Sequence, residues 1–356
     1  MDRTKAKEWG SDLIRTRISR EPYFLEERTW RDFKFWEWIF IVFALLSISI
    51  SIGFSVFQLV IALIDGGKYV FPVLIILNNI FSAYFLWNGV MEELPFKLLM
   101  QLIIKTIIWI FDLIYFLVPS KEVVEGVEED DYKEIRDIRF YISSSMLFLT
   151  LITGTVVIYQ YWTSNTAIFR TVGTEPKYVQ MCKMWNFCHS MMLFDAVVFI
   201  TVVFHLCNFP EFLESYASFY LIPLWLLATV VYVLLGIKAI ERESRMLTYV
   251  FYVASHCQPI FIIVMLAKAT QSSLGLLLYI SLFFTAGLSF ITHIGLLVTV
   301  VRLQFTYGMG LKQAAAREEE RKNLVTAVDV NNSELTKFRD TERQGQTQPP
   351  PTETEL

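Results

Sequence analysis

Eight segments of this chain, each about 20 to 30 residues long, are almost free of Asp, Glu, Lys and Arg. A helix needs about 20 predominantly apolar residues to cross the hydrocarbon core of a bilayer. The segments lie at residues 38–64, 69–91, 98–118, 140–163, 184–208, 215–237, 246–268 and 274–301. They predict an all-α fold, a polytopic membrane helical bundle of about eight transmembrane helices.

Lys and Arg are distributed unevenly between the two sides of this bundle. They are dense before the first segment, and the 164–183 loop and the stretch after the last segment carry more of them. The 119–139 loop on the opposite side is dominated by Asp and Glu. Because positive charge accumulates in cytoplasmic loops, we expect both termini to be cytoplasmic, as an even number of crossings allows. The basic N-terminus lacks the apolar core of a signal peptide, so the first segment should act as an uncleaved anchor.

The pattern divides the chain into four parts. Residues 1–36 form a cytoplasmic N-terminal segment and 37–303 the transmembrane domain. Residues 304–325 contain strong helix formers with alternating charge, which predicts a cytoplasmic helix. Residues 326–356 are polar and Pro-containing, which predicts a disordered cytoplasmic tail.

Composition argues against several classes of partner and cofactor. Hydrophobic residues make up 54% of the chain and the net charge is −4, so there is no basic excess for nucleic acid. The four cysteines include no CxxC pair, so neither a disulfide framework nor a metal site is expected. The four histidines offer no second pair matched in depth for bis-histidine haem. The HExxH and HxxxH spacings of a zinc hydrolase are missing. We expect no cofactor.

The segments nevertheless contain ionisable residues, which are costly in lipid and therefore normally face the bundle interior. Counted from the flanking cytoplasmic charges at 1.5 Å per residue, four of them fall at a similar depth in the inner half of the bilayer. These four are Lys105, Asp195, His256 and His293, and Asn78, Asn79 and Gln258 fall near the same level. Asp112 lies two turns beyond Lys105 on the same helix face, near the outer end.

Two interpretations of this polar layer remain open. In the first, it forms an ion or proton pathway, or a polar solute site, with Lys105 and Asp195 as a charge pair. In the second, a structural ion pair and satisfied histidines hold the helices together. Pro259, which follows Gln258, could break the seventh segment at this level because proline has no N–H group.

The last four residues are Glu-Thr-Glu-Leu, and they resemble a class I PDZ-domain ligand. In that mode Leu356 would fill an apolar pocket and Thr354 would supply the hydroxyl contact, while backbone amides capture the carboxylate. The resemblance covers these residues alone and implies a PDZ scaffold as a partner.

The leading functional hypothesis is a transporter or channel for an ion or a small polar solute. The alternatives are a non-enzymatic receptor or scaffold-linked signalling protein, and a membrane-embedded lipid hydrolase. Enzymatic activity is the less favoured class, the plasma membrane is the favoured location, and the sequence leaves the oligomeric state open.

Overall fold

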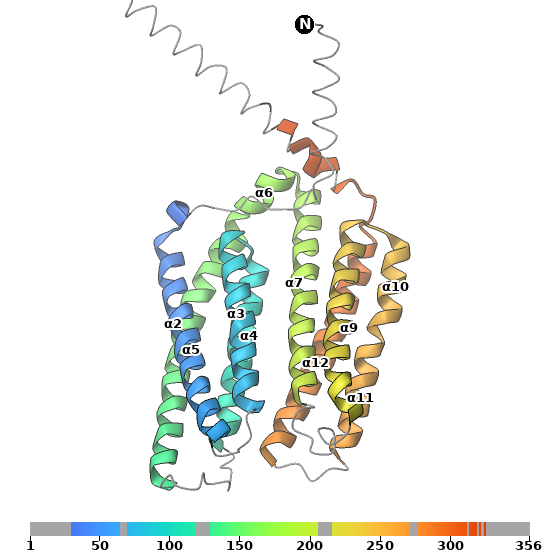
Figure 1. Ribbon diagram of the computed structural model, residues 1–356. Helices are drawn as coiled ribbons and strands as arrows, with labels where there is room; N and C mark the ends of the chain where they lie inside the picture. The colour runs from blue at the N-terminus through green and yellow to red at the C-terminus, as the bar shows by residue number, and fades with distance from the viewer. Residues whose placement is uncertain are drawn as a thin grey trace, which may run out of the picture.

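In a computed structural model, eight helices of this chain are long and apolar enough to cross a membrane, which confirms the predicted helical class. The structure describes residues 30–64, 70–117, 129–205, 216–270, 276–311, 313–318, 320–321 and 324. These residues form mainly helices and contain no strand. Figure 1 shows the long helices running side by side in two groups, with the short helix α6 (Thr166–Val172) at one end.

The first group is a four-helix bundle in which each helix contacts the next and the last returns to the first. Its members are α2 (Phe35–Ile64), α3 (Val70–Met91), α4 (Pro95–Leu117) and α5 (Glu129–Ser164). Phe40, Leu98, Leu102 and Val157 fill its core near the α6 end. These helices therefore enclose a common interior, into which polar side chains can point away from lipid.

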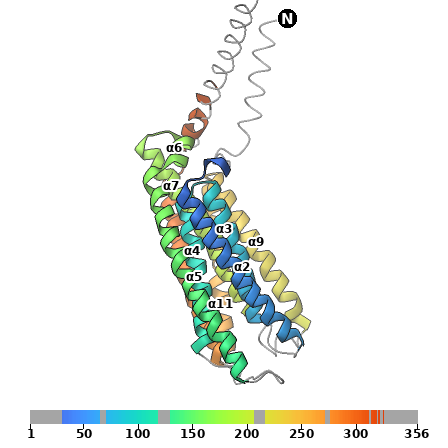
Figure 2. The same cartoon turned by 90° about the vertical axis from the view of Figure 1, so that its left-hand side faces the viewer.

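The second group has the same order of contacts between its helices, and the last again returns to the first. Its members are α7 (Pro176–His205), α9 (Tyr216–Glu241), the pair α10 (Arg245–Ser255) and α11 (Cys257–Ala269), and α12 (Leu276–Gln304). Helix α7 also contacts α3 and α4, which joins the two bundles. Figure 2, turned by 90°, shows the helices still nearly parallel. The interruption between α10 and α11 at His256 lies three residues before Pro259, close to the predicted break.

Each bundle contains a tight turn of the same form at an equivalent position. The α3–α4 turn places Glu93 at φ 53° and the α9–α10 turn places Glu243 at φ 50°. In each turn the following residue donates its backbone N–H across the turn, from Leu94 to Gly89 and from Ser244 to Ala239. Non-glycine residues with positive φ are uncommon, so the same strained turn stands between the second and third helices of both bundles.

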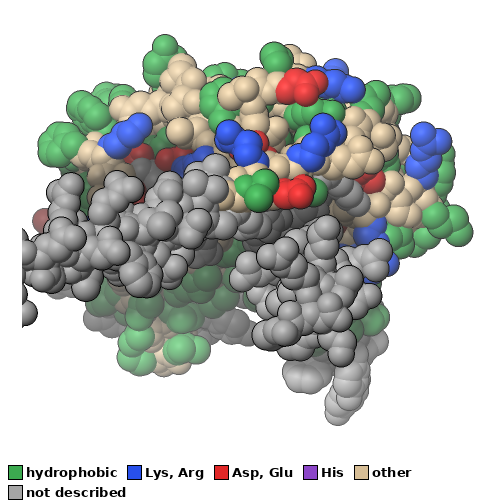
Figure 3. All heavy atoms as spheres, turned by 90° about the horizontal axis from the view of Figure 1, so that it is seen from above, with side chains coloured by type: hydrophobic (Ala, Val, Ile, Leu, Met, Phe, Trp, Pro, Cys, Tyr) green, Lys and Arg blue, Asp and Glu red, His purple; other side chains and the backbone are tan. Residues whose placement is uncertain are grey.

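The outer surface of the helices is apolar, as lipid contact requires. Leu227, Ile291 and Ile294 expose 60% or more of their surface although they lie in mid-helix. At the end of the molecule that carries α6, Lys and Arg side chains are spread over the face seen in Figure 3. Apolar sides and a charged end are the surface pattern of a multi-pass membrane protein. The sidedness of the termini stays a prediction.

Helix α5 differs from the expectation at its start. The sequence placed the fourth segment at 140–163 and Arg139 in an outer loop, but the helix already begins at Glu129. Arg139 is 3% exposed and points into the first bundle. Arg139 is buried because it pairs with a buried carboxylate on α4. Counting the charges in loops gives no information on such a partner.

Candidate functional site

The buried face of α4 carries polar residues along most of its length. Lys97, Gln101, Lys105 and Asp112 are each 5% exposed or less. Their spacing of four, four and seven residues places all of them on one side of an α-helix. At 1.5 Å per residue this row covers about 22 Å of the helix axis, most of the thickness of a hydrocarbon core. We call these four residues the α4 polar row.

In the middle of the row Lys105 belongs to a network that joins three helices. Its Nζ donates to Oδ1 of Asn79 on α3 at 2.8 Å. The amide nitrogen of Asn79 donates in turn to the hydroxyl of Ser51 on α2 at 2.8 Å, and to the backbone carbonyl of Ile75. The network holds the Lys105 ammonium inside the first bundle.

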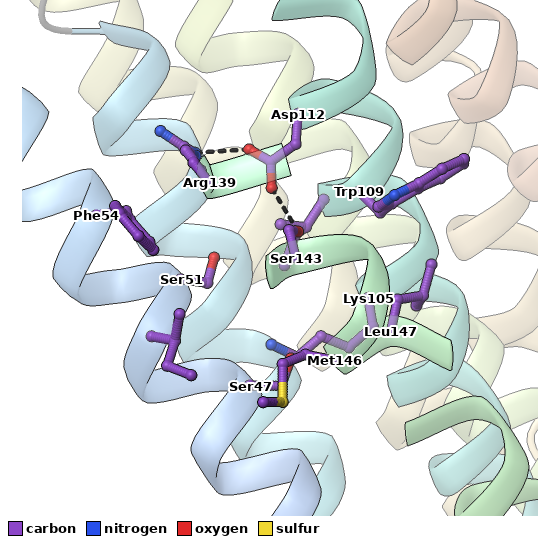
Figure 4. Close-up of a pocket in the computed structure, with 12 residues that line it drawn as sticks. Ser47, Ser51, Phe54, Lys105, Trp109, Asp112, Arg139, Ser143, Met146 and Leu147 are labelled. Carbon is purple, nitrogen blue, oxygen red and sulfur yellow. Dashed lines mark hydrogen bonds and ion pairs between the residues drawn. The ribbon is translucent and has the colours of Figure 1, made fainter. Parts of the chain in front are cut away.

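At the far end of the row Asp112 forms a buried ion pair. Arg139 Nη2 on α5 lies 2.6 Å from Asp112 Oδ1, and the hydroxyl of Ser143 donates to Oδ2 at 2.8 Å. A second guanidinium nitrogen of Arg139 donates to Gln58 on α2. Figure 4 shows Asp112 held between Arg139 and Ser143. A charge-assisted pair of this kind fixes α4 against α5 and α2.

A small pocket lies between these two networks. Side chains of α2, α4 and α5 line it, and its polar lining consists of Ser47, Ser51, Lys105, Asp112, Arg139 and Ser143. About 20 Å³ is open to the centre of a water-sized sphere, which is room for one or two water molecules or a small ion. In Figure 4 the side chain of Lys105 runs from α4 towards the α2 side of this pocket.

Between Lys105 and the α6 end, the row contains polar atoms that lack protein partners. Gln101 is 0% exposed, and within the described residues neither its amide oxygen nor its amide nitrogen makes a hydrogen bond. The same holds for the hydroxyl of Ser82 on α3. Buried polar groups are almost always satisfied by protein or water, so this level of the row indicates water. Beyond it, Lys97 Nζ pairs with Glu92 at 2.7 Å.

A separate polar cluster occupies the second bundle and centres on Asp195, which is 0% exposed. Oδ1 accepts from Gln258 Nε2 on α11 at 3.2 Å and from the hydroxyl of Thr292 on α12 at 3.1 Å. Oδ2 lies 3.2 Å from His293 Nδ1 and 3.4 Å from the hydroxyl of Tyr232 on α9. Four helix segments of the second bundle therefore meet at one carboxylate.

The His293 ring contacts this cluster through one of its two nitrogens. Its Nδ1 faces Asp195, and its Nε2 is buried without a hydrogen-bond partner among the described residues. In the tautomer that carries its proton on Nδ1, the ring donates a hydrogen bond to the carboxylate.

The structure does not gather the predicted polar layer into one site. The expected charge pair between Lys105 and Asp195 is wrong in geometry, because Lys105 bonds to Asn79 in the first bundle while Asp195 is surrounded in the second. Asn78 lies between the bundles and donates to Thr201 on α7 at 3.2 Å. His256 is exposed on the outer surface, where its Nδ1 bonds to the carbonyl of Tyr252. The depth argument placed these residues at one level but carried no information on which way each side chain faces.

Several members of the two clusters were missed in the sequence. Gln101, Tyr232 and Thr292 stand in apolar segments, Arg139 follows other charged residues, Ser143 begins a run of three serines, and none of the five belongs to a recognisable motif. Four-residue spacing from Lys105 finds Gln101, and the same spacing links Arg139 to Ser143. Thr354 and Leu356 of the PDZ-ligand resemblance lie outside the described residues.

The described ranges contain no cluster of metal-ligating side chains. No three His, Cys, Asp or Glu residues come together there in a way that would hold an ion. Both clusters are built instead from hydrogen bonds and ion pairs between neighbouring helices.

Comparison with known proteins bears on the second bundle. A family model described as a domain of unknown function (DUF7789) matches residues 172–302. This range contains α7 to α11 and nearly all of α12, and with them Asp195 and its partners. Neither a curated protein nor a solved structure gives a match to the chain.

Proposed function

We propose that this multi-pass membrane protein moves an ion or a small polar solute across the bilayer along the α4 polar row. The observation that carries the proposal is the unpaired Gln101 amide, which is 0% exposed in the same row as Lys105 and Asp112. The Gln101 amide differs in this respect from the carboxylate of Asp195, whose oxygen atoms each contact two polar groups. Water beside Gln101 and Ser82 would connect the Lys97 end of the row to the Lys105 pocket.

The two clusters receive different roles in this proposal. Lys105 and Asp112 line the route, with Asn79 holding the ammonium in place. Asp195, Gln258 and His293 hold the helices of the second bundle together, because each oxygen of Asp195 already contacts two polar groups of neighbouring helices. Asn78 fixes one bundle against the other. Intramembrane ionisable residues mark substrate pathways more often than chance.

Flux through reconstituted liposomes tests the proposal. The full-length chain would be purified and reconstituted, and the uptake of radioactive chloride, rubidium and glycerol compared with protein-free liposomes. We expect uptake of at least one probe, and we expect Lys105→Met and Gln101→Leu to reduce it at least about tenfold, the effect of about 1.4 kcal/mol on a barrier.

Lys238→Met is the matched control, because Lys238 sits at the charged end of α9 and pairs with Glu241 at 2.6 Å, away from the row. Uptake that equals the protein-free level for every probe would overturn the proposal. So would equal uptake by the control and by both variants of the row.

A further inference from the structure

The Lys105 pocket has more positive than negative charge. Its described lining contains two cationic side chains, Lys105 and Arg139, and one carboxylate, Asp112. All three are 4% exposed or less. Arg139 and Asp112 neutralise each other at 2.6 Å, which leaves the ammonium of Lys105 without a counter-ion in the lining.

The nearest charged residues on α5 do not supply one. Arg136 and Asp137 lie three and two residues before Arg139 and pair with each other at 3.6 Å. On α3 the partner of Lys105 is the neutral amide of Asn79. On α2 the polar lining consists of serine hydroxyls. An uncompensated charge in a low-dielectric interior is strongly unfavourable, so an anion bound in this pocket would stabilise the charged form of Lys105.

We propose that this pocket binds one small monovalent anion of halide size, which deepens the proposed function by naming the class of ion, and which rests on it for any role in transport. Lys105 has three N–H groups, and Asn79 accepts from one of them. The other two have no acceptor among the described residues and lie in the pocket lining. An anion there would also accept a hydrogen bond from the hydroxyl of Ser51. The oxygen of this hydroxyl accepts a hydrogen bond from Asn79, and its proton is free to point into the pocket.

The dimensions of the pocket restrict the anion. A space of about 20 Å³ for the centre of a water-sized sphere suits chloride or bromide, which are little larger than water. Sulfate, phosphate and gluconate are too large for it. The apolar part of the lining, which includes Phe54 and Met146, favours a weakly hydrated halide over a strongly hydrated polyatomic anion.

Chloride NMR on the full-length protein in detergent tests the binding directly. The line of free chloride broadens when the ion exchanges with a protein site. We expect wild-type protein to broaden it, bromide to reverse the effect by competition, and gluconate or sulfate to leave it unchanged. A wild-type sample that produces no broadening, or one in which sulfate competes as well as bromide, overturns the inference.

Two variants with opposite expected signs separate an anion site from a structural role. Lys105→Met removes the ammonium and should weaken chloride binding at least about tenfold. Asp112→Asn removes the only carboxylate among the described lining residues and should strengthen binding by a similar factor, even though it breaks the pair with Arg139. Lys238→Met should match the wild type. Unchanged binding in Lys105→Met, or weaker binding in Asp112→Asn, contradicts the inference.

The two proposals fail in different ways. Chloride binding is measured in detergent, where nothing is transported. Its absence overturns the anion site and leaves uptake of rubidium or glycerol as evidence for the α4 route. Chloride binding without uptake of any probe would keep the site and overturn transport.

Discussion

The ammonium of Lys105 lies 2.8 Å from the amide oxygen of Asn79, so the charge at the middle of α4 is held by a neutral side chain. The first bundle differs from the second in how its buried charge is compensated. Asp112, the carboxylate of the row, forms its ion pair with Arg139 and not with Lys105. The first bundle therefore has an ammonium with donors to spare, whereas the second has a carboxylate with all its acceptor positions used.

Gln101 distinguishes a hydrated interior from a dry one. In a dry interior its unpaired amide costs about 1 to 3 kcal/mol, so Gln101→Leu would raise the free energy of unfolding by that amount. We expect instead that Gln101→Leu changes the free energy of unfolding by less than about 0.5 kcal/mol and causes the loss of uptake described above, because water already satisfies the amide. Thermal unfolding in detergent and liposome uptake measure the two quantities, and a strongly stabilised variant with full uptake would contradict a water-filled row.

Arg139 should be necessary for stability. Removing one partner of a buried ion pair costs about 3 to 5 kcal/mol, so Arg139→Gln should lower the free energy of unfolding by that amount. The double variant Arg139→Gln with Asp112→Asn should recover part of the loss, because the unpaired carboxylate is removed as well. Arg136→Gln, three residues away on the same helix, is the control and should cost less than about 1 kcal/mol. Equal losses for Arg136 and Arg139 would show that the pair contributes nothing specific.

Two histidines that looked alike in the sequence should behave differently. His293 contacts Asp195 at the centre of the second bundle, so His293→Gln should lower the free energy of unfolding by about 1 to 3 kcal/mol. His256 is exposed and bonds to a carbonyl of its own helix, so His256→Gln should change it by less than about 0.5 kcal/mol. Unfolding of the two variants in the same detergent makes the comparison, and a larger effect at His256 would contradict the described geometry.

The C-terminal four residues make a prediction that is independent of the bundle. If the tail is a class I PDZ ligand, deleting Leu356 should abolish binding to an array of PDZ domains, because the apolar pocket and the carboxylate site both lose their ligand. Thr354→Ala should weaken binding, and Glu353→Gln is the control that leaves both contacts in place. An array signal that survives the deletion of Leu356 rejects the motif.

The general architecture could be predicted because it depends on length and apolarity alone. Seven of the eight predicted segments correspond to one long described helix each, and the seventh segment in chain order corresponds to the pair α10 and α11. The break before Pro259 follows from the missing N–H of proline. The candidate site could be predicted less well. Depth along a helix gave the level of Lys105, Asp195 and His256, but the direction of each side chain depends on how the helices rotate against one another.

Arg139 shows a second limit of the sequence. Positive charges near a segment end normally lie in the loop, and Arg139 was assigned there for that reason. Its carboxylate partner is 27 positions away on another helix, so no local pattern connects the two. The four-residue spacing of Lys97, Gln101 and Lys105 was local information, and it would have revealed the row if the uncharged Gln101 had been weighed with its neighbours.

Cysteine accessibility at Gln101 tests the central claim most directly, namely that water reaches the interior face of α4. In a background with Cys257→Ser, which removes an exposed thiol, Gln101→Cys would be exposed to a charged, water-soluble methanethiosulfonate reagent in liposomes. Leu99→Cys is the matched control, since Leu99 lies two residues away and faces outwards. The account predicts that Gln101→Cys is modified and Leu99→Cys is not. An unreactive thiol at position 101, in a protein that remains folded, would contradict it.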